Sequence, residues 1–384
     1  ILKRHEVFSG LALHSPPGLR LLATTPQVGI VQVSDEAAAL ARMGEVGRVP
    51  FRLSEEPSVR CEVLACPSGL VLVMLWVHHM SFDILSQGIL HGELRTLLSS
   101  REPTLERAVA RLPELPVQYV DYSIWSRQCV SQGLFDAIPV LAELVPHVSK
   151  ALDLPLDRPR PRQWTFQGDR VVTRLPEGLK LPHAGTTPFV AYLTAFFVQL
   201  WKSSGQEAVV IGVPYHGRDL ACLQPLCGYF INMLPIVGRA STQTTVAGAL
   251  EQTQERWQQA MDHAQVPFLH IVDNLNKQHM QPDPSRNSVF QAMLNYRAET
   301  LKPLDDTRFR VQQVHHLEGH MDLDVQIDAA DSGTVITLNY CTSLFEPRTA
   351  ERFAAQYMAA LRAMSLDEWK HIQTWRIPAA PRLL

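Results

Sequence analysis

The sequence has few cysteines and does not open with a basic-then-apolar segment. Only six cysteines occur among its 384 residues, too few for a disulfide scaffold in a chain of this length. Since no secretory signal is present, we expect reduced thiols and a cytoplasmic protein. The pairs Cys61/Cys66 and Cys222/Cys227 have equal spacing. That spacing is the long end of what zinc ligands use, and the pairs lie far apart in sequence, so we predict no metal site.

Long apolar runs and an excess of one charge sign are also absent. The longest strictly apolar run, Leu70 to Val77, is eight residues, far below the roughly 18 needed to span a bilayer. Lys and Arg number 35 and Asp and Glu number 38, giving a net charge of -3. This balance provides no electrostatic reason to bind nucleic acid or an anionic membrane. We therefore expect neither kind of partner.

The composition is that of an ordinary globular protein, with 46% apolar and 19% charged residues. At roughly 150 residues per domain, this length predicts two domains. No repeat of 20 to 50 residues is present, which disfavours solenoids and propellers. The first residue is Ile1 and not Met, so we expect the chain to be part of a longer polypeptide.

The first half contains a strand pair followed by a helix. Residues Arg60 to Leu64 and Leu70 to Val77 read as strands. Because the second run is apolar at every position, it predicts a central strand buried on both faces. From Asp83 onward, apolar residues recur at helical spacing. The residues His78 and His79 therefore lie where a core strand turns into a helix.

The second half mixes helices and strands in the same way. Thr187-Pro188 is an N-cap followed by a first-turn proline, and it begins a buried helix that ends at Ser204-Gly205. The proline-rich stretch Leu154 to Pro161 cannot be helical, and we place the inter-domain linker there. Further elements are expected as strands at Val209 to Pro214, Val289 to Leu294, Leu323 to Ile327 and Thr334 to Tyr340, and as a helix from Arg348 to about Met364.

The familiar signatures GxSxG, GxxxxGK[ST], GxGxxG and HExxH are all missing. What remains is the run His78 to Asp83. Adjacent strand residues face opposite ways, so one histidine is expected in the fold and one in a cleft. Asp83 falls in the first helical turn, where the helix dipole favours a carboxylate and the neutral form of a nearby histidine. Taken alone, the pair is compatible with a structural, catalytic or metal-binding role.

A second histidine group, His315-His316 with His320, has near-helical spacing. A solvated polar turn is favoured there over a set of metal ligands.

Six segments in order resemble motifs of the condensation domains of nonribosomal peptide synthetases and polyketide-peptide hybrid synthases. They cover nearly the whole chain, whereas HHxxxD alone would be shared with chloramphenicol acetyltransferase and related acyltransferases. The segments are Arg4-His5-Glu6 (RHExLRT), His78 to Asp83 (HHxxxDG), Tyr119 to Trp125 (YxDYAxW), Leu156 to Pro161 (TDRPRP), Ser204 to Arg218 (SGQEDxxxGxPxxGR) and Gly228 to Pro235 (GFFVNTLP).

The resemblance implies an α/β pseudo-dimer of two chloramphenicol-acetyltransferase-like halves in a V, here residues 1–157 and 158–384, with the active site in a tunnel between them. It makes His79 the catalytic residue. His78, Asp83 and Arg218 become structural residues of the active site, the last two as an ion pair. Further tunnel or substrate candidates are Ser81, Ile84, Gly217 and Asn232.

The implied activity is transfer of an acyl or polyketide chain to an amine or another nucleophile. The chain would come from a phosphopantetheine thioester on an acyl or peptidyl carrier domain, so the partners are carrier domains and no cofactor binds to this domain itself. Backbone donors near Gly217 and Arg218 would face the oxyanion. The end of the sequence resembles the truncated condensation domains of fungal highly reducing polyketide synthases, such as the lovastatin nonaketide synthase.

One departure from the motif bears on this activity. Ile84 replaces the family's glycine, and its branched side chain predicts a narrowed path and poor handling of an aminoacyl acceptor. The competing interpretation is that Ile84 packs with Leu85 and Ile89 in the helix stripe. The departure also motivates the alternative function, a degenerate domain that docks carrier domains or assists chain shaping.

Overall fold

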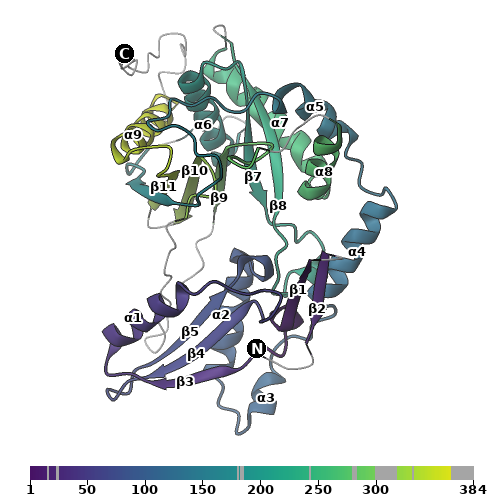
Figure 1. The fold of residues 1–384 in the computed structure, drawn as a ribbon, viewed down its shortest axis with the longest axis vertical. Coiled ribbons are helices and arrows are strands. Elements are labelled where there is room, and N and C mark those ends of the chain that lie inside the picture. Colours follow the sequence, from purple (N-terminus) through teal and green to yellow (C-terminus); the bar gives the residue numbers. More distant parts are fainter. Residues whose placement is uncertain are drawn as a thin grey trace. The chain divides into compact units, whose positions relative to one another are not determined.

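The computed structural model describes residues 1–14, 17–22, 26–179, 181, 186–241, 244–278, 283–298, 318–330 and 333–364 (Figure 1). The chain forms two compact units. Unit 1 comprises Ile1–Leu134 and His216–Ile231, and unit 2 comprises Phe135–Tyr215 and Asn232–Leu384. This division by packing differs from the expected halves 1–157 and 158–384, which stay a prediction. Both units mix helices and strands, which confirms the α/β class.

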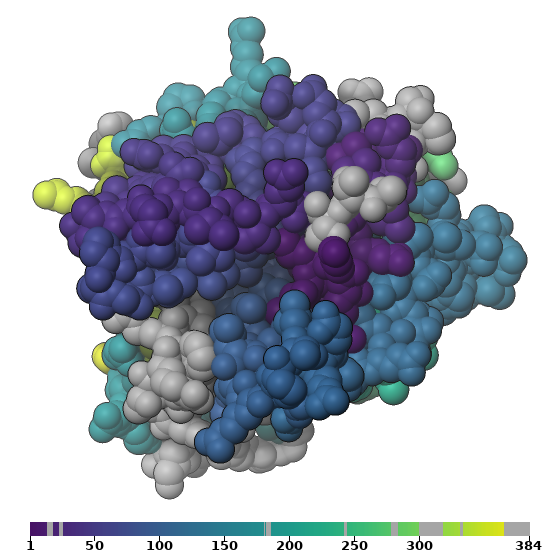
Figure 2. Space-filling view, turned by 90° about the horizontal axis from the view of Figure 1, so that it is seen from below, coloured from purple at the N-terminus to yellow at the C-terminus, as the bar shows by residue number. Residues whose placement is uncertain are grey.

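Unit 1 contains a hairpin, a three-stranded sheet and several helices. The sheet has the order β3-β4-β5, with β3 parallel and β5 antiparallel to β4. Helix α1 packs on one face of this sheet through Ala39, which contributes to a cluster with Leu64 and Met74. Purple and blue N-terminal segments form much of the surface seen in Figure 2. The elements are η1 (Glu6–Ser9), β1 (Gly10–His14), β2 (Pro17–Leu21), β3 (Val28–Gln32), α1 (Glu36–Gly47), β4 (Val59–Ala65), β5 (Val71–Val77), η2 (His79–Ser81), α2 (Ile84–Leu98), α3 (Leu105–Val109), α4 (Tyr119–Ser131) and η3 (Ala221–Leu223).

Strand β5 corrects one expectation from the sequence. The apolar run predicts a central strand buried on both faces, but β5 lies at the end of the sheet order. Val71 and Val73 are 57% and 48% exposed. They share a face that points away from Met74, which is 4% exposed. An apolar run therefore predicted the strand correctly, but not whether both of its faces are covered.

Unit 2 is built on a six-stranded sheet of order β6-β11-β10-β9-β7-β8. Strand β9 is parallel to β7 and β10, and the remaining neighbours are antiparallel. The expected strands of the second half are therefore present, although β9 begins three residues later than the predicted strand. The elements are α5 (Ile138–Val148), β6 (Gly168–Arg174), α6 (Pro188–Ser204), β7 (Ala208–Tyr215), β8 (Asn232–Arg239), α7 (Val246–Asp262), α8 (Phe268–Gln278), β9 (Ala292–Arg297), β10 (Leu323–Ala330), β11 (Gly333–Cys341) and α9 (Pro347–Ala363).

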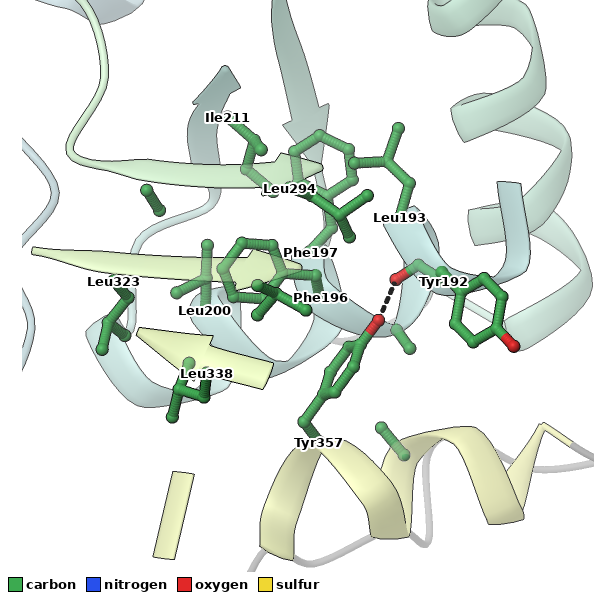
Figure 3. Packing of buried hydrophobic residues seen from close by; sticks show 14 of the residues in the cluster. Tyr192, Leu193, Phe196, Phe197, Leu200, Ile211, Leu294, Leu323, Leu338 and Tyr357 are labelled. Carbon is green, nitrogen blue, oxygen red and sulfur yellow. Dashed lines mark hydrogen bonds between the residues drawn. The ribbon is translucent and has the colours of Figure 1, made fainter. Parts of the chain in front are cut away.

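Helix α6 is the centre of the unit 2 core. Its N-cap Thr187 accepts a hydrogen bond from the backbone N–H of Val190, and it ends at Gly205 with φ 69°, as the sequence predicts. Figure 3 shows its apolar side chains between the sheet and α9, where the Tyr357 hydroxyl donates to the carbonyl oxygen of Tyr192 at 3.0 Å. This packing explains why the helix sequence is apolar on nearly every side.

The stretch Leu154 to Pro161 has neither helix nor strand, as its prolines require. It belongs to unit 2, and Leu154 is buried in the α6 core. Arg160 pairs with Asp322 at the start of β10. Within the described part of the chain, no helix has the length and apolar character needed to cross a membrane.

Candidate functional site

The two histidines form a tight turn after β5. The strand ends at Val77, and His78 caps the short helix η2, its Nδ1 accepting the backbone N–H of Met80 at 3.2 Å. His78 is half-buried against Phe51, whereas His79 is exposed. The two side chains therefore occupy different environments, and the cause is the turn and not continued strand geometry. The expected placement of one histidine in a cleft stays a prediction.

The hydrogen bonding of His79 defines which nitrogen can accept a proton. Its Nδ1 lies 2.6 Å from the carbonyl oxygen of Phe82. Because a carbonyl oxygen can only accept, Nδ1 carries the hydrogen. In the neutral imidazole the lone pair is then on Nε2. The turn thus presents an exposed histidine whose Nε2 is the basic atom.

Asp83 is the N-cap of α2, where its carboxylate meets the positive end of the helix. Its side chain is 1% exposed. Oδ1 accepts the backbone N–H of Ser86 at 2.8 Å, and Oδ2 accepts the N–H of Phe230 at 3.1 Å. A buried carboxylate with this many donors is suited to holding structure, and is not placed to exchange protons.

The predicted ion pair between Asp83 and Arg218 is present. The Arg218 guanidinium donates from one terminal nitrogen to Oδ2 at 2.5 Å and from the other to Oδ1 at 3.0 Å, and its side chain is 3% exposed. It also lies over the Phe230 ring, 4.2 Å from the ring centroid. The segment His216–Ile231, which follows β7 of unit 2 in the sequence, is therefore anchored inside unit 1 by a buried bidentate pair.

Ser86 is a second anchor that the sequence analysis missed. Its hydroxyl is within hydrogen-bond distance of Asp83 Oδ1 and of the Gly228 carbonyl, and accepts the Gly228 N–H at 3.0 Å and an Arg218 N–H at 2.9 Å. The signal available in the sequence was its position, three residues after an N-cap aspartate.

Gly217 is required by the backbone of the same segment. Its φ is 63°, in the left-handed region that favours glycine. A Cβ there would overlap the carbonyl oxygen of Phe230. The backbone N–H of Arg218 donates to Nδ1 of His216 at 3.0 Å. This donor is therefore engaged, contrary to the expectation that it faces an oxyanion.

Arg4 and His5 of the RHE-like motif, together with Glu93 of α2, hold the segment near Cys227. His5 is 1% exposed, and its Nδ1 accepts the backbone N–H of Cys227 at 3.3 Å. Its Nε2 therefore carries the hydrogen and donates to Glu93 of α2 at 3.2 Å. Arg4 donates to the other oxygen of Glu93 at 2.7 Å. Burial raises the pKa of Glu93, but the hydrogen bonds from His5 and Arg4 outweigh it and the pKa is lowered.

The remaining candidates lie in different surroundings. Ser81 is 1% exposed, and its hydroxyl oxygen has no hydrogen-bond partner among the described residues. Ile84 is the first residue of α2 and is half-buried. Asn232 begins β8 in unit 2, where its amide donates to the carbonyls of Ala264 and Val266 and accepts from the N–H of Phe268. Substrate contact by these three residues stays a prediction.

Metal ligation has no support in the described ranges, which contain no group of three or more His, Cys, Asp or Glu side chains able to hold an ion. All six cysteines are free thiols. His315 and His316 lie outside the described residues.

Comparison with known proteins gives the family. The family model of the condensation domain matches residues 27–378, and the chain belongs to this family. Tyrocidine synthase 2 of Brevibacillus parabrevis is 29% identical over 336 residues, which are 84% of this chain and 9% of that protein. Phosphinothricin tripeptide synthetase PhsC of Streptomyces viridochromogenes is 29% identical over 368 residues, 90% of this chain and 33% of that protein. The chain thus spans a third or less of the length of these curated relatives.

Solved structures share the fold. The X-domain from teicoplanin biosynthesis superposes with a TM-score of 0.79 at 22% identity, covering 94% of this chain and 84% of that chain. The condensation domain from the Monacolin K polyketide synthase MokA gives a TM-score of 0.74 at 19% identity, covering 96% and 87%. The expected condensation-domain fold is confirmed.

Breaking the ion pair from one side should destabilise unit 1. In Asp83→Asn the Arg218 guanidinium stays buried without its counter-charge, and in Arg218→Met the Asp83 carboxylate does. The free energy of unfolding should therefore fall by about 3–5 kcal/mol in each variant. The double variant should lose less than the sum of the two singles. Chemical denaturation measures this, with Arg52→Met as the control in an exposed pair. If the double variant loses as much unfolding free energy as the two single variants together, the two side chains do not stabilise unit 1 as a pair.

Glu93 should make unit 1 acid-sensitive. A carboxyl whose pKa is lowered in the folded state contributes stability above its ordinary pKa of 4.5, and this contribution disappears as pH falls through the lowered value. The difference in unfolding free energy between wild type and Glu93→Gln should therefore be largest near neutral pH and shrink below about pH 4.5. Glu251→Gln, at an exposed position of α7, is the control. A difference that does not vary with pH would refute this role.

Proposed function

We propose that this condensation domain transfers an acyl or polyketide chain from a carrier-bound thioester to an amine or another nucleophile, with His79 as the base or orienting group. The observation that carries the proposal is the geometry of His79. The Nδ1–H bond to the Phe82 carbonyl leaves Nε2 as an acceptor on an exposed side chain. An acceptor nucleophile needs such a group to take or orient its proton.

The reaction needs no covalent enzyme intermediate, because a thioester is already activated. The amine nitrogen attacks the thioester carbonyl carbon, and the carbon–sulfur bond breaks as the amide forms. The proton lost from the amine moves to Nε2 of His79 and then to the departing pantetheine sulfur. Asp83 has no step in this sequence, since its carboxylate is buried and engaged by Arg218.

Carrier domains are the proposed partners, with the acyl chain carried on their phosphopantetheine arm. The two named relatives are much longer proteins, of which this chain matches a third or less, and this supports a role within a larger assembly. Nothing in the net charge of -3 favours nucleic acid as a partner. The narrower relation to fungal polyketide synthases remains a prediction.

Loss of His79 should remove most of the activity. With an acyl-pantetheine thioester and a simple amine, His79→Ala should turn over about 10² to 10⁴ times more slowly than the wild-type chain. Release of the free pantetheine thiol measures the rate. His320→Ala is the matched control, because the His320 side chain is 61% exposed in unit 2. Equal rates for wild type and His79→Ala would overturn the catalytic role.

A docking function is the second candidate. It is favoured by Ile84 at the position of the motif glycine, and by one neighbour of this fold whose structure is a complex of the X-domain and OxyB from teicoplanin biosynthesis. In this case the domain would bind the acyl-carrier form or a partner enzyme without forming product.

Ile84→Gly separates the two candidates. If Ile84 restricts an otherwise active site, the variant should form amide from an aminoacyl-pantetheine acceptor at least severalfold faster than wild type. Glycine in the first turn should lower helix stability by up to about 1 kcal/mol. Leu85→Gly controls for that cost at the neighbouring, 41% exposed position. If every variant binds the acylated carrier domain and none forms the amide product, the docking function is favoured.

A further inference from the structure

The ring of Tyr229 lies beside the imidazole of His79. The ring centroids are 5.2 Å apart, and the ring planes meet at 77°, which is an edge-to-face contact. The two residues are 150 positions apart in the sequence but belong to the same unit. The motif that this segment resembles has phenylalanine at this position, so the aromatic ring is shared and the hydroxyl is not.

The backbone around Tyr229 is held on three sides. The preceding residue, Gly228, donates its N–H to the Ser86 hydroxyl at 3.0 Å, and the following residue, Phe230, donates its N–H to Asp83 at 3.1 Å. The carbonyl oxygen of Tyr229 itself accepts from the Tyr119 hydroxyl at 2.9 Å. The backbone that carries the Tyr229 ring is therefore bonded to α2 and α4.

A histidine on the surface normally samples a broad range of ring rotations, because its second side-chain torsion is soft. At His79 two contacts restrict that rotation. The Phe82 carbonyl fixes the Nδ1 side of the ring, and Tyr229 packs against the imidazole. Burial and the nearby Asp83 carboxylate raise the pKa of Tyr229, so its phenol is neutral at neutral pH and brings no charge to the site.

We infer that Tyr229 is a positioning residue, whose ring keeps the His79 imidazole in the rotation and tautomer that direct Nε2 toward the acceptor nucleophile. The expected effect of Tyr229 on catalysis rests on the proposed function. Its expected effect on the orientation and tautomer of the imidazole does not. A ring held in place avoids the loss of rate that a misplaced base causes.

The test compares Tyr229→Ala with Tyr229→Phe in the full chain. Tyr229→Ala should lower kcat by about 10- to 100-fold with little change in KM for the acyl-pantetheine, since the ring acts on the base and not on substrate binding. Tyr229→Phe keeps the ring and should stay within about threefold of wild type. If Tyr229→Ala fails to fold, Tyr229→Leu replaces it, because leucine keeps bulk without the aromatic edge.

Nitrogen NMR of 15N-histidine-labelled protein gives a second measurement that is independent of turnover. The His79 signal, assigned by its absence in His79→Ala, should report the Nδ1–H tautomer in wild type and Tyr229→Phe. In Tyr229→Ala it should shift toward a mixture of both tautomers. A merely structural residue would change thermal stability without changing this signal.

Two outcomes would overturn the inference. One is a Tyr229→Ala variant with unchanged kcat and an unchanged His79 signal. The other is a Tyr229→Phe variant that loses as much kcat as Tyr229→Ala, because the hydroxyl and not the ring would then matter. If His79→Ala is fully active, the proposed function fails, while the NMR signal still decides whether Tyr229 positions the imidazole.

Discussion

The buried carboxylate of Asp83 is the constraint on which the rest of the site depends. A charge that is 1% exposed requires donors on every side. Those donors come from its own helix, through Ser86, and from a segment more than 130 residues away, through Arg218 and Phe230. Satisfying one carboxylate therefore joins two distant parts of the chain, and the histidine turn that precedes Asp83 is fixed at the same time.

This arrangement explains why the site needs so many residues with no chemical role. Gly217 allows the close approach to Phe230, and His5 with Glu93 holds the backbone near Cys227. Each of them secures the path of the segment past α2. The result is an exposed imidazole on a hydrogen-bonded support, which is the arrangement that the role proposed for His79 requires.

The resemblance of the ordered motifs to the condensation family predicted the fold and the Asp83–Arg218 pair, because it implied both. The caps of α6 were predictable for a separate, local reason, since Thr187-Pro188 and Ser204-Gly205 are typical of helix ends. The exposed face of β5 was not, since an apolar run cannot reveal what covers it. The contact of Tyr229 with His79 also left no sequence signal, because it depends on how far the segment reaches into unit 1.

Hydrogen exchange at single amides tests most directly whether the segment is held in this way. The N–H groups of Cys227, Gly228 and Phe230 lie outside helices and strands, yet each donates to a buried side chain. We predict that all three exchange as slowly as the amides in the core of unit 1. Exchange at the rate of an open loop would show that the segment is not anchored, and would contradict this account of the site.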